Sequence, residues 1–197
     1  MSKLLNFEDQ FTFYAAYHTN KNNVLIHILC VPTILFTALI LTHGIPGASR
    51  SLASLEVGST TLDPTFPFLW AAGNAIYFIL LEPIAGFLYA PILLSLGHLS
   101  NVLYSSHHDA AMKYAGIAFV ASWIAQFVGH AKFEGRAPAL FDSLLQSLVL
   151  AVFFVFLEIL FFLGYKPALF KRLQNKTGVE VAKYRREKAA KEGRKAK

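Results

Sequence analysis

The chain alternates long apolar stretches with short polar ones. Five stretches contain no Asp, Glu, Lys or Arg, except for Glu158 in the last of them; they cover residues 22–49, 64–81, 83–108, 114–131 and 143–165. A helix needs about 20 apolar residues to cross the hydrocarbon core of a bilayer. We therefore predict membrane helices near residues 24–43, 66–82, 84–104, 114–131 and 143–163.

Two shorter features frame these predicted spans. Only Glu82 and Pro83 separate the second span from the third, which predicts either one kinked element or a tight re-entrant pair. Residues 44–63 are rich in Gly, Ser, Thr and Pro and are predicted to form an exposed loop.

A helical pattern precedes the first span. One face of this helix is expected to carry Phe7, Phe11, Tyr14 and His18, which recur at i, i+4, i+7 and i+11. We predict an interfacial helix that is anchored by its aromatic side chains. Asn20, Asn22 and Asn23 then predict a turn, in which one asparagine caps the next helix.

Composition agrees with a membrane protein. Of the 197 residues 55% are hydrophobic and only 15% are charged, whereas an ordinary soluble domain has about 25% charged residues. The charge is also uneven, because residues 166–197 hold 12 of the 18 Lys and Arg and 3 of the 12 Asp and Glu. We predict an all-α polytopic bundle of about 4–6 membrane helices, with a membrane-embedded domain at 1–165 and a basic tail at 166–197.

The basic tail indicates topology more than it indicates a binding partner. Basic segments that follow apolar spans lie on the cytoplasmic side and contact anionic lipid. We therefore expect a cytoplasmic C-terminus and no nucleic-acid partner. The single cysteine, Cys30, excludes an intramolecular disulfide and a cysteine-only metal site.

Histidines near the ends of apolar stretches are the main candidates for chemistry. Four of the seven histidines have this placement, namely His18, His27, His108 and His130. Histidine inside or beside a membrane span is costly and is usually functional. These four either share a metal ion or act separately as hydrogen-bonded interfacial residues, and the residues alone favour neither. Imidazoles with one carboxylate suit ferrous iron and also zinc.

Polar neighbours of His130 extend the candidate site. Gln126, His130 and Glu134 are spaced at i, i+4 and i+8, which places them on one face of a helix. Glu134 is therefore a candidate metal ligand, or a carboxylate that orients the histidine. Lys132 and Arg136 flank it and could hold a fatty-acid carboxylate or mark the cytoplasmic side.

A second candidate lies in the polar break before residue 114. One histidine of the sequence His107-His108-Asp109 could face a metal, with Asp109 orienting it. The same three residues are equally compatible with a solvated loop.

Two blocks of the sequence resemble a known family. The first block reads Phe13-Tyr14-Ala15-Ala16-Tyr17-His18-Thr19-Asn20-Lys21-Asn22-Asn23-Val24-Leu25-Ile26-His27 and is followed by Val31-Pro32. The second contains Gln126-Phe127-Val128-Gly129-His130, Phe133-Glu134 and Arg136-Ala137-Pro138-Ala139-Leu140. Both are similar to signatures of the fungal 2-hydroxy fatty acid dioxygenase family, an integral membrane family.

This resemblance implies a function. Members of the fungal family are iron(II)-dependent dioxygenases of the endoplasmic reticulum. They use O2 to shorten 2-hydroxy fatty acids by one carbon during phytosphingosine breakdown. For 2-hydroxypalmitate the products would be pentadecanoate and carbon dioxide. The expected substrates are thus a 2-hydroxy long-chain fatty acid and O2, and the expected surroundings are the lipid bilayer.

The resemblance also implies site residues. The family's essential histidines correspond to His18, His27 and His130, while a further one falls near His107 or His108. We hypothesise that these residues hold Fe²⁺, that Glu134 is a ligand or base, and that Arg136 or Lys132 holds the substrate carboxylate. Asn20 and Asn23 are candidates for hydrogen bonds to the substrate, with helix capping as the alternative.

Three other classes compete with the dioxygenase interpretation. A non-enzymatic membrane scaffold with a recruiting tail would need the tail and not the histidines. Di-iron desaturases and hydroxylases carry eight or more histidines in closely spaced clusters, whereas this chain has seven and one adjacent pair. A transporter would need polar residues deep within several spans, and here they gather at the ends.

Overall fold

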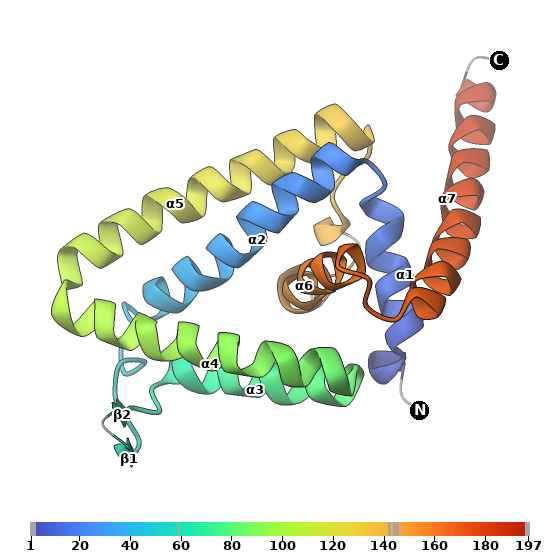
Figure 1. Cartoon of the computed structure of the whole chain (residues 1–197). Helices are drawn as coiled ribbons and strands as arrows, with labels where there is room; N and C mark the ends of the chain where they lie inside the picture. The colour runs from blue at the N-terminus through green and yellow to red at the C-terminus, as the bar shows by residue number, and fades with distance from the viewer. Residues whose placement is uncertain (1–2, 59, 142, 144–145, 196–197) are drawn as a thin grey trace. The chain divides into compact units, whose positions relative to one another are not determined.

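The computed structural model describes residues 3–58, 60–141, 143 and 146–195 (Figure 1). The chain divides into two compact units, which we describe separately. The first unit contains the chain up to Val24 and from His130 onward, and the second runs from Leu25 to Gly129.

The second unit contains the longest apolar helices. They are α2 (Lys21–Thr42), which begins within the first unit, α3 (Phe66–Leu81), α4 (Pro83–Ser106) and α5 (His108–Gly129). Only His107 separates α4 from α5, and its backbone N–H donates to the carbonyl of Leu103 as the cap of α4. Since each of these helices covers most of one predicted span, the assignment of helices to the first four apolar stretches is confirmed.

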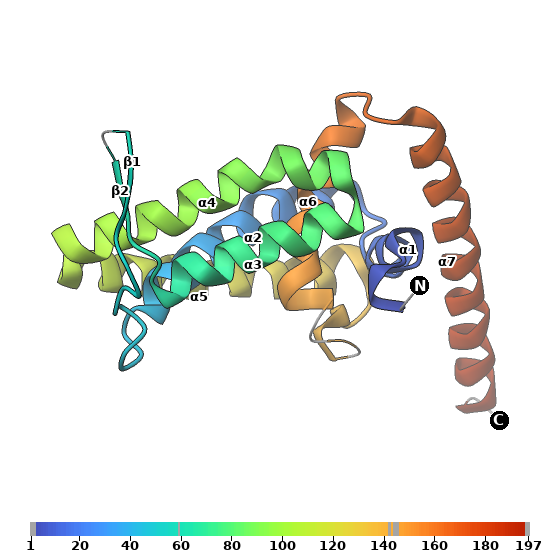
Figure 2. The same cartoon turned by 90° about the horizontal axis from the view of Figure 1, so that it is seen from below.

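Glu82 and Pro83 reverse the chain and join α3 to α4 as a helical hairpin, which settles the choice left open by the sequence. The Glu82 carboxylate caps α4 by accepting a 2.7 Å hydrogen bond from the backbone N–H of Ala85. Pro83 is the first residue of α4, where the missing N–H of proline costs nothing. Figures 1 and 2 show the two helices side by side.

Close contact within this hairpin depends on a glycine. A Cβ atom on Gly86 would lie 2.4 Å from backbone atoms of Phe78 and Ile79. Only a residue without a side chain allows the two backbones to approach this closely.

In the described part of the chain, three helices are long and apolar enough to cross a membrane. They are Lys21–Thr42, Pro83–Ser106 and the continuous helical segment His108–Glu134, and two shorter apolar helices cover Phe66–Leu81 and Ser147–Phe162. Large apolar side chains such as Leu29 and Phe87 are exposed at 65% and 73%, as lipid-facing side chains must be. The protein is an all-α helical membrane bundle.

The predicted loop at 44–63 contains a small antiparallel hairpin. Its strands, β1 (Leu55–Val57) and β2 (Thr60–Leu62), pair Val57 with Thr60. Asn101 of α4 holds the end of the loop, because its side chain donates to the Asp63 carbonyl and accepts from the Thr65 hydroxyl, both at 2.7 Å.

The first unit is built around α1 (Phe7–Tyr17), α6 (Ala151–Phe162) and α7 (Pro167–Lys195). Short helical turns complete its described part: η1 (Lys3–Leu5), the π-helical η2 (His130–Glu134), η3 (Ala139–Phe141) and the π-helical η4 (Gln146–Leu150). The aromatic face predicted for α1 packs on α6, where the Phe11 ring meets Phe154 and Phe161 edge-on at 5.4 and 5.5 Å. These buried rings form the core of the unit.

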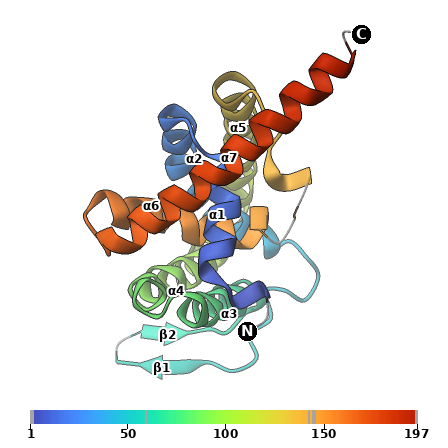
Figure 3. The same ribbon diagram turned by 90° about the vertical axis from the view of Figure 1, so that its right-hand side faces the viewer.

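The basic tail is a long helix that packs along α1. Glu8 of α1 forms ion pairs with Lys176 at 2.6 Å and Arg172 at 3.2 Å, both on α7. The hydrogen bond from Lys176 is the main reason that the pKa of Glu8 lies below its usual value. Figures 2 and 3 show α7 beside α1.

The hairpin predicts a specific cost for filling the space at Gly86. We expect Gly86→Ala to destabilise the protein by about 1–3 kcal/mol, because the added methyl group overlaps backbone and not a movable side chain. Gly73→Ala is the matched control, since nothing lies within 4 Å of a Cβ atom there. Thermal unfolding in detergent measures both variants, and equal stabilities would contradict the close approach.

The ion pairs of Glu8 predict a pH dependence. Because the folded-state pKa is below the usual 4.5, the contribution is complete above pH 5 and disappears as the pH falls through the folded pKa. Glu8 is partly exposed, so we expect about 1 kcal/mol or less. The difference in thermal unfolding temperature between the wild type and Glu8→Gln should be present at pH 7 and should vanish once the pH is below the folded-state pKa of Glu8. A difference that persists in acid would contradict this assignment.

Candidate metal centre

His18 follows the last residue of α1 and is held by the turn before it. Its ring stacks on Tyr14 with 4.1 Å between centroids. Its Nδ1 lies 2.7 Å from the Tyr14 carbonyl oxygen, and a carbonyl can only accept, so Nδ1 donates. In the neutral ring the lone pair is then on Nε2, which is the form that a metal ligand requires.

Tyr14 is a rigid support for this histidine. Its side chain is 3% exposed and its ring contacts Phe11 and Phe154. Burial raises the pKa of Tyr14 well above its usual value. The ring under His18 therefore remains a neutral phenol.

His130 lies where α5 gives way to the π-helical turn η2. The backbone N–H of Gly135 donates to the His130 carbonyl at 3.0 Å, which is the i to i+5 bond of a π-helix. The His130 side chain is 3% exposed. Its ring centroid lies 5.0 Å from that of His18.

His27 is the third histidine of this group, and it lies on α2. The first turn of α2 belongs to the first unit, and His27 lies one helical turn beyond Asn23 on the same unbroken helix. It is 3% exposed. Ring nitrogens of His18, His27 and His130 lie within 4.8 Å of one another, so the three histidines could hold a metal ion.

Glu134 ends η2 and binds the segment that connects α1 to α2. Its Oε2 accepts a hydrogen bond from the Thr19 hydroxyl at 2.8 Å. Its Oε1 accepts one from the backbone N–H of Asn20 at 2.9 Å and one from the Asn23 side chain at 3.1 Å. Asn20 also accepts a bond from the backbone N–H of Asn22 at 2.9 Å. The Asn20 side chain therefore accepts a local hydrogen bond at the start of α2, and the Asn23 side chain donates to a residue far away in the chain.

Arg136 lies between two tyrosine rings in the first unit. The centre of its guanidinium group is 3.4 Å from the centroid of Tyr17 and 3.9 Å from that of Tyr184 on α7. One of its nitrogens donates to the Ala16 carbonyl at 3.4 Å. Cation–π contacts on both faces fix the plane of the guanidinium group.

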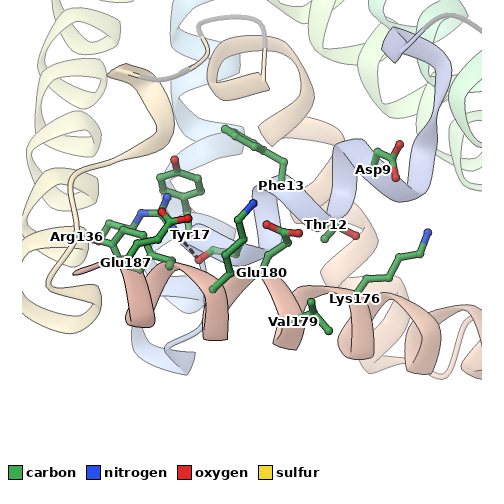
Figure 4. Close-up of a pocket in the computed structure, with 12 residues that line it drawn as sticks. Asp9, Thr12, Phe13, Tyr17, Arg136, Lys176, Val179, Glu180 and Glu187 are labelled. Carbon is green, nitrogen blue, oxygen red and sulfur yellow. Dashed lines mark hydrogen bonds between the residues drawn. The ribbon is translucent and has the colours of Figure 1, made fainter. Parts of the chain in front are cut away.

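A cavity of about 550 Å³ opens beside this stack, between α1 and α7 (Figure 4). Arg136 and Tyr17 line one end, and Phe13 and Val179 contribute apolar surface. Lys132 is exposed, with its ammonium group 5.7 Å from the Phe133 ring, and does not line the cavity. Of the two basic side chains that flank Glu134, Arg136 therefore lines this open cavity, whereas Lys132 is exposed at the surface.

The structure does not bring His107 and His108 to this group. His108 begins α5 and His130 follows its last residue, so about 33 Å of helix separates them at 1.5 Å per residue. Both residues are exposed, and His108 lies 4.0 Å from Asp109. Neither histidine belongs to the group of metal-ligating side chains found in the described part of the chain.

The sequence did not single out three residues that the structure places in this region. Tyr14 appeared only as part of an aromatic face, although its spacing of four residues from His18 was a signal of contact. Thr19 lies between the candidate residues His18 and Asn20 and was not itself considered. Tyr184 gave no signal, because a tyrosine in a charged tail is ordinary and its contact with Arg136 is tertiary.

The donor chemistry of the three histidines fits a first-row divalent metal. Neutral imidazoles suit iron, zinc, copper and nickel ions. The group contains no carboxylate from the described residues. The fold and the histidines define a polytopic helical membrane protein with a candidate metal centre at its helix ends.

Comparison with known proteins gives the family. The family model described as 2-hydroxy-palmitic acid dioxygenase Mpo1-like matches residues 4–163, a range that includes all three histidines. A curated relative, the 2-hydroxy-palmitic acid dioxygenase MPO1 of Saccharomyces cerevisiae, is 38% identical over 173 residues, which cover 87% of this chain and 90% of the yeast protein. No solved structure matches. The chain belongs to the Mpo1-like family, as the resemblance of its two blocks predicted.

The metal centre predicts which histidines bind metal. The substitutions His18→Ala, His27→Ala and His130→Ala should each lower the amount of bound iron or zinc at least 10-fold. Two imidazoles hold a metal far more weakly than three. His107→Ala and His108→Ala should bind as much metal as the wild type. Elemental analysis of purified, metal-loaded protein measures this. Loss of metal in either of these two controls would contradict the assignment.

Proposed function

We propose that this protein is an iron(II)-dependent dioxygenase that shortens 2-hydroxy fatty acids by one carbon. The observation that carries the proposal is the group of three histidines within 4.8 Å, which lies inside the range matched by the family model. The yeast relative is named for the same substrate class. The long apolar helices in the described part of the chain suit a substrate that stays dissolved in lipid.

The reaction is chemically self-contained. One molecule each of 2-hydroxypalmitate and O2 would give one molecule each of pentadecanoate, carbon dioxide and water. This equation balances in atoms and electrons. The bond between C1 and C2 breaks, C2 becomes the new carboxyl carbon, and O2 is reduced without a further electron donor.

The histidines would hold the iron, which supplies the electron transfer to O2 that carbon–carbon cleavage requires. The chain's own contribution is to orient its ligands and to place the substrate. The bond from His18 Nδ1 to the Tyr14 carbonyl orients that ring. His27 and His130 are each 3% exposed, which limits the access of water to their side chains.

Arg136 is our candidate for the substrate carboxylate. Tyrosine rings cover its two faces, but a guanidinium group has five N–H donors in its plane, one of which donates to the Ala16 carbonyl. It lines the cavity between α1 and α7, whereas Lys132 is at the exposed surface and could attract the acid from a distance. Asn20 and Asn23 are better explained as parts of the α2 cap than as substrate ligands.

We further propose the endoplasmic reticulum membrane as the location, with several spans and a cytoplasmic C-terminus. The basic helix α7 supports this orientation through the positive-inside rule. A supply of 2-hydroxy fatty acids from phytosphingosine breakdown would give the enzyme its substrate.

The direct test is product formation by purified protein in detergent. With ferrous iron in air, 2-hydroxypalmitate should yield pentadecanoate, detected by mass spectrometry. An iron chelator should abolish the product, and His130→Ala should lower the rate at least 100-fold. His108→Ala is the matched control and should retain the wild-type rate.

Two outcomes would count against the proposal. If folded, iron-loaded protein formed no shortened acid from any 2-hydroxy lipid, a scaffold role would replace the enzyme. If His130→Ala remained active, the three histidines would not be the reaction centre.

A further inference from the structure

The acidic side chain of Glu134 binds the segment between His18 and His27, and both of its oxygens accept hydrogen bonds. Oε1 accepts two bonds, from the Asn20 backbone and the Asn23 side chain, and Oε2 accepts one from Thr19. All three distances are between 2.8 and 3.1 Å. Oε1 thus has both of its lone pairs engaged, and Glu134 is not a member of the group of ligand atoms that lie within 4.8 Å of one another.

The donors lie at the start of α2, where a carboxylate is favoured for a second reason. The first N–H groups of a helix have no partner within the helix, and the helix dipole places positive charge at this end. Glu134 therefore acts as an anionic cap supplied from a distant part of the chain. Asn23 is fully buried, so loss of its acceptor would leave a polar group without its bond in a dry place.

Each histidine of the centre is attached to one part of this cap. His18 immediately precedes Thr19, His27 follows Asn23 by one turn of α2, and His130 begins the π-helical turn that Glu134 ends. Through short, rigid segments, the same three hydrogen bonds set the spacing of all three rings. Metal sites need this support because ligands must be held within about 0.5 Å of their working positions.

We propose that Glu134 is a positioning residue, which joins η2 to the start of α2 and thereby assembles the three histidines, and that it is neither a metal ligand nor a proton-transferring base. This inference rests on the proposed metal centre but not on the identity of the substrate. It revises the role that the sequence suggested for Glu134.

The Glu134→Gln variant distinguishes a positioning residue from a metal ligand or a proton-transferring base. Glu134→Gln keeps an oxygen to accept from Asn20 and Asn23, and its amide group can donate to the Thr19 hydroxyl, which is able to accept. It removes the negative charge that a ligand or a base would need. Glu134→Ala removes the cap altogether, and Asn23→Ala removes one of its bonds from a residue with no acid–base chemistry.

The experiment measures metal affinity by titration of the metal-free protein with Co²⁺ or Zn²⁺. We expect Glu134→Gln to bind within about 3-fold of the wild type, and Glu134→Ala and Asn23→Ala to bind at least 10-fold more weakly. Glu56→Ala, an exposed glutamate on β1, is the matched control and should bind normally. Thr19→Val removes a single donor and provides a milder variant if Glu134→Ala fails to fold.

Two results would overturn the inference. Equal loss of metal in Glu134→Gln and Glu134→Ala would make the carboxylate a ligand. Normal metal binding by Glu134→Gln together with a large fall in kcat and loss of one limb of its pH profile would make it a base. The metal titration remains decisive for positioning even if the protein forms no pentadecanoate, so failure of the proposed substrate is distinguishable from failure of this inference.

Discussion

The carboxylate of Glu134 joins two segments that are more than 110 residues apart in the chain. One segment leads from α1 into α2 and contains two of the histidines, and the other leaves α5 and contains the third. Without this cap, the start of α2 would keep unpaired N–H groups next to a buried asparagine. The candidate metal centre therefore depends on a few hydrogen bonds at helix ends more than on the packing of the helices themselves.

A bilayer explains why the chemistry gathers there. Hydrocarbon cannot satisfy polar groups, so α2 and α5 carry their charged residues only in their first two turns, and α3 and α4 contain none. His18, His27 and His130 all lie at or near a helix terminus or the π-helical turn beyond one. The same constraint places His107 and His108 at a helix end as well, but at the opposite end of α5.

The basic tail has a structural role besides its charge. Glu8 pairs with two basic residues of α7, and Tyr184 of α7 covers one face of Arg136. Arg136 in turn lies against Tyr17, the neighbour of His18. The helix that the sequence suggested as a tail thus packs into the first unit and completes the wall of its cavity.

The sequence by itself determined the helical membrane character, the approximate helix positions and the two blocks that hold the key histidines. These follow from local properties, namely the length of apolar stretches and the types of residue that bind metal. Only the tertiary structure decided that Glu82 and Pro83 form a hairpin and that His107 and His108 lie about 33 Å along α5 from His130. The tertiary structure alone showed the hydrogen bond from Asn23 to Glu134 and the cation–π contact between Tyr184 and Arg136. Such contacts between distant residues depend on the direction in which each helix leaves its turn, and hydrophobic periodicity carries no information about that direction.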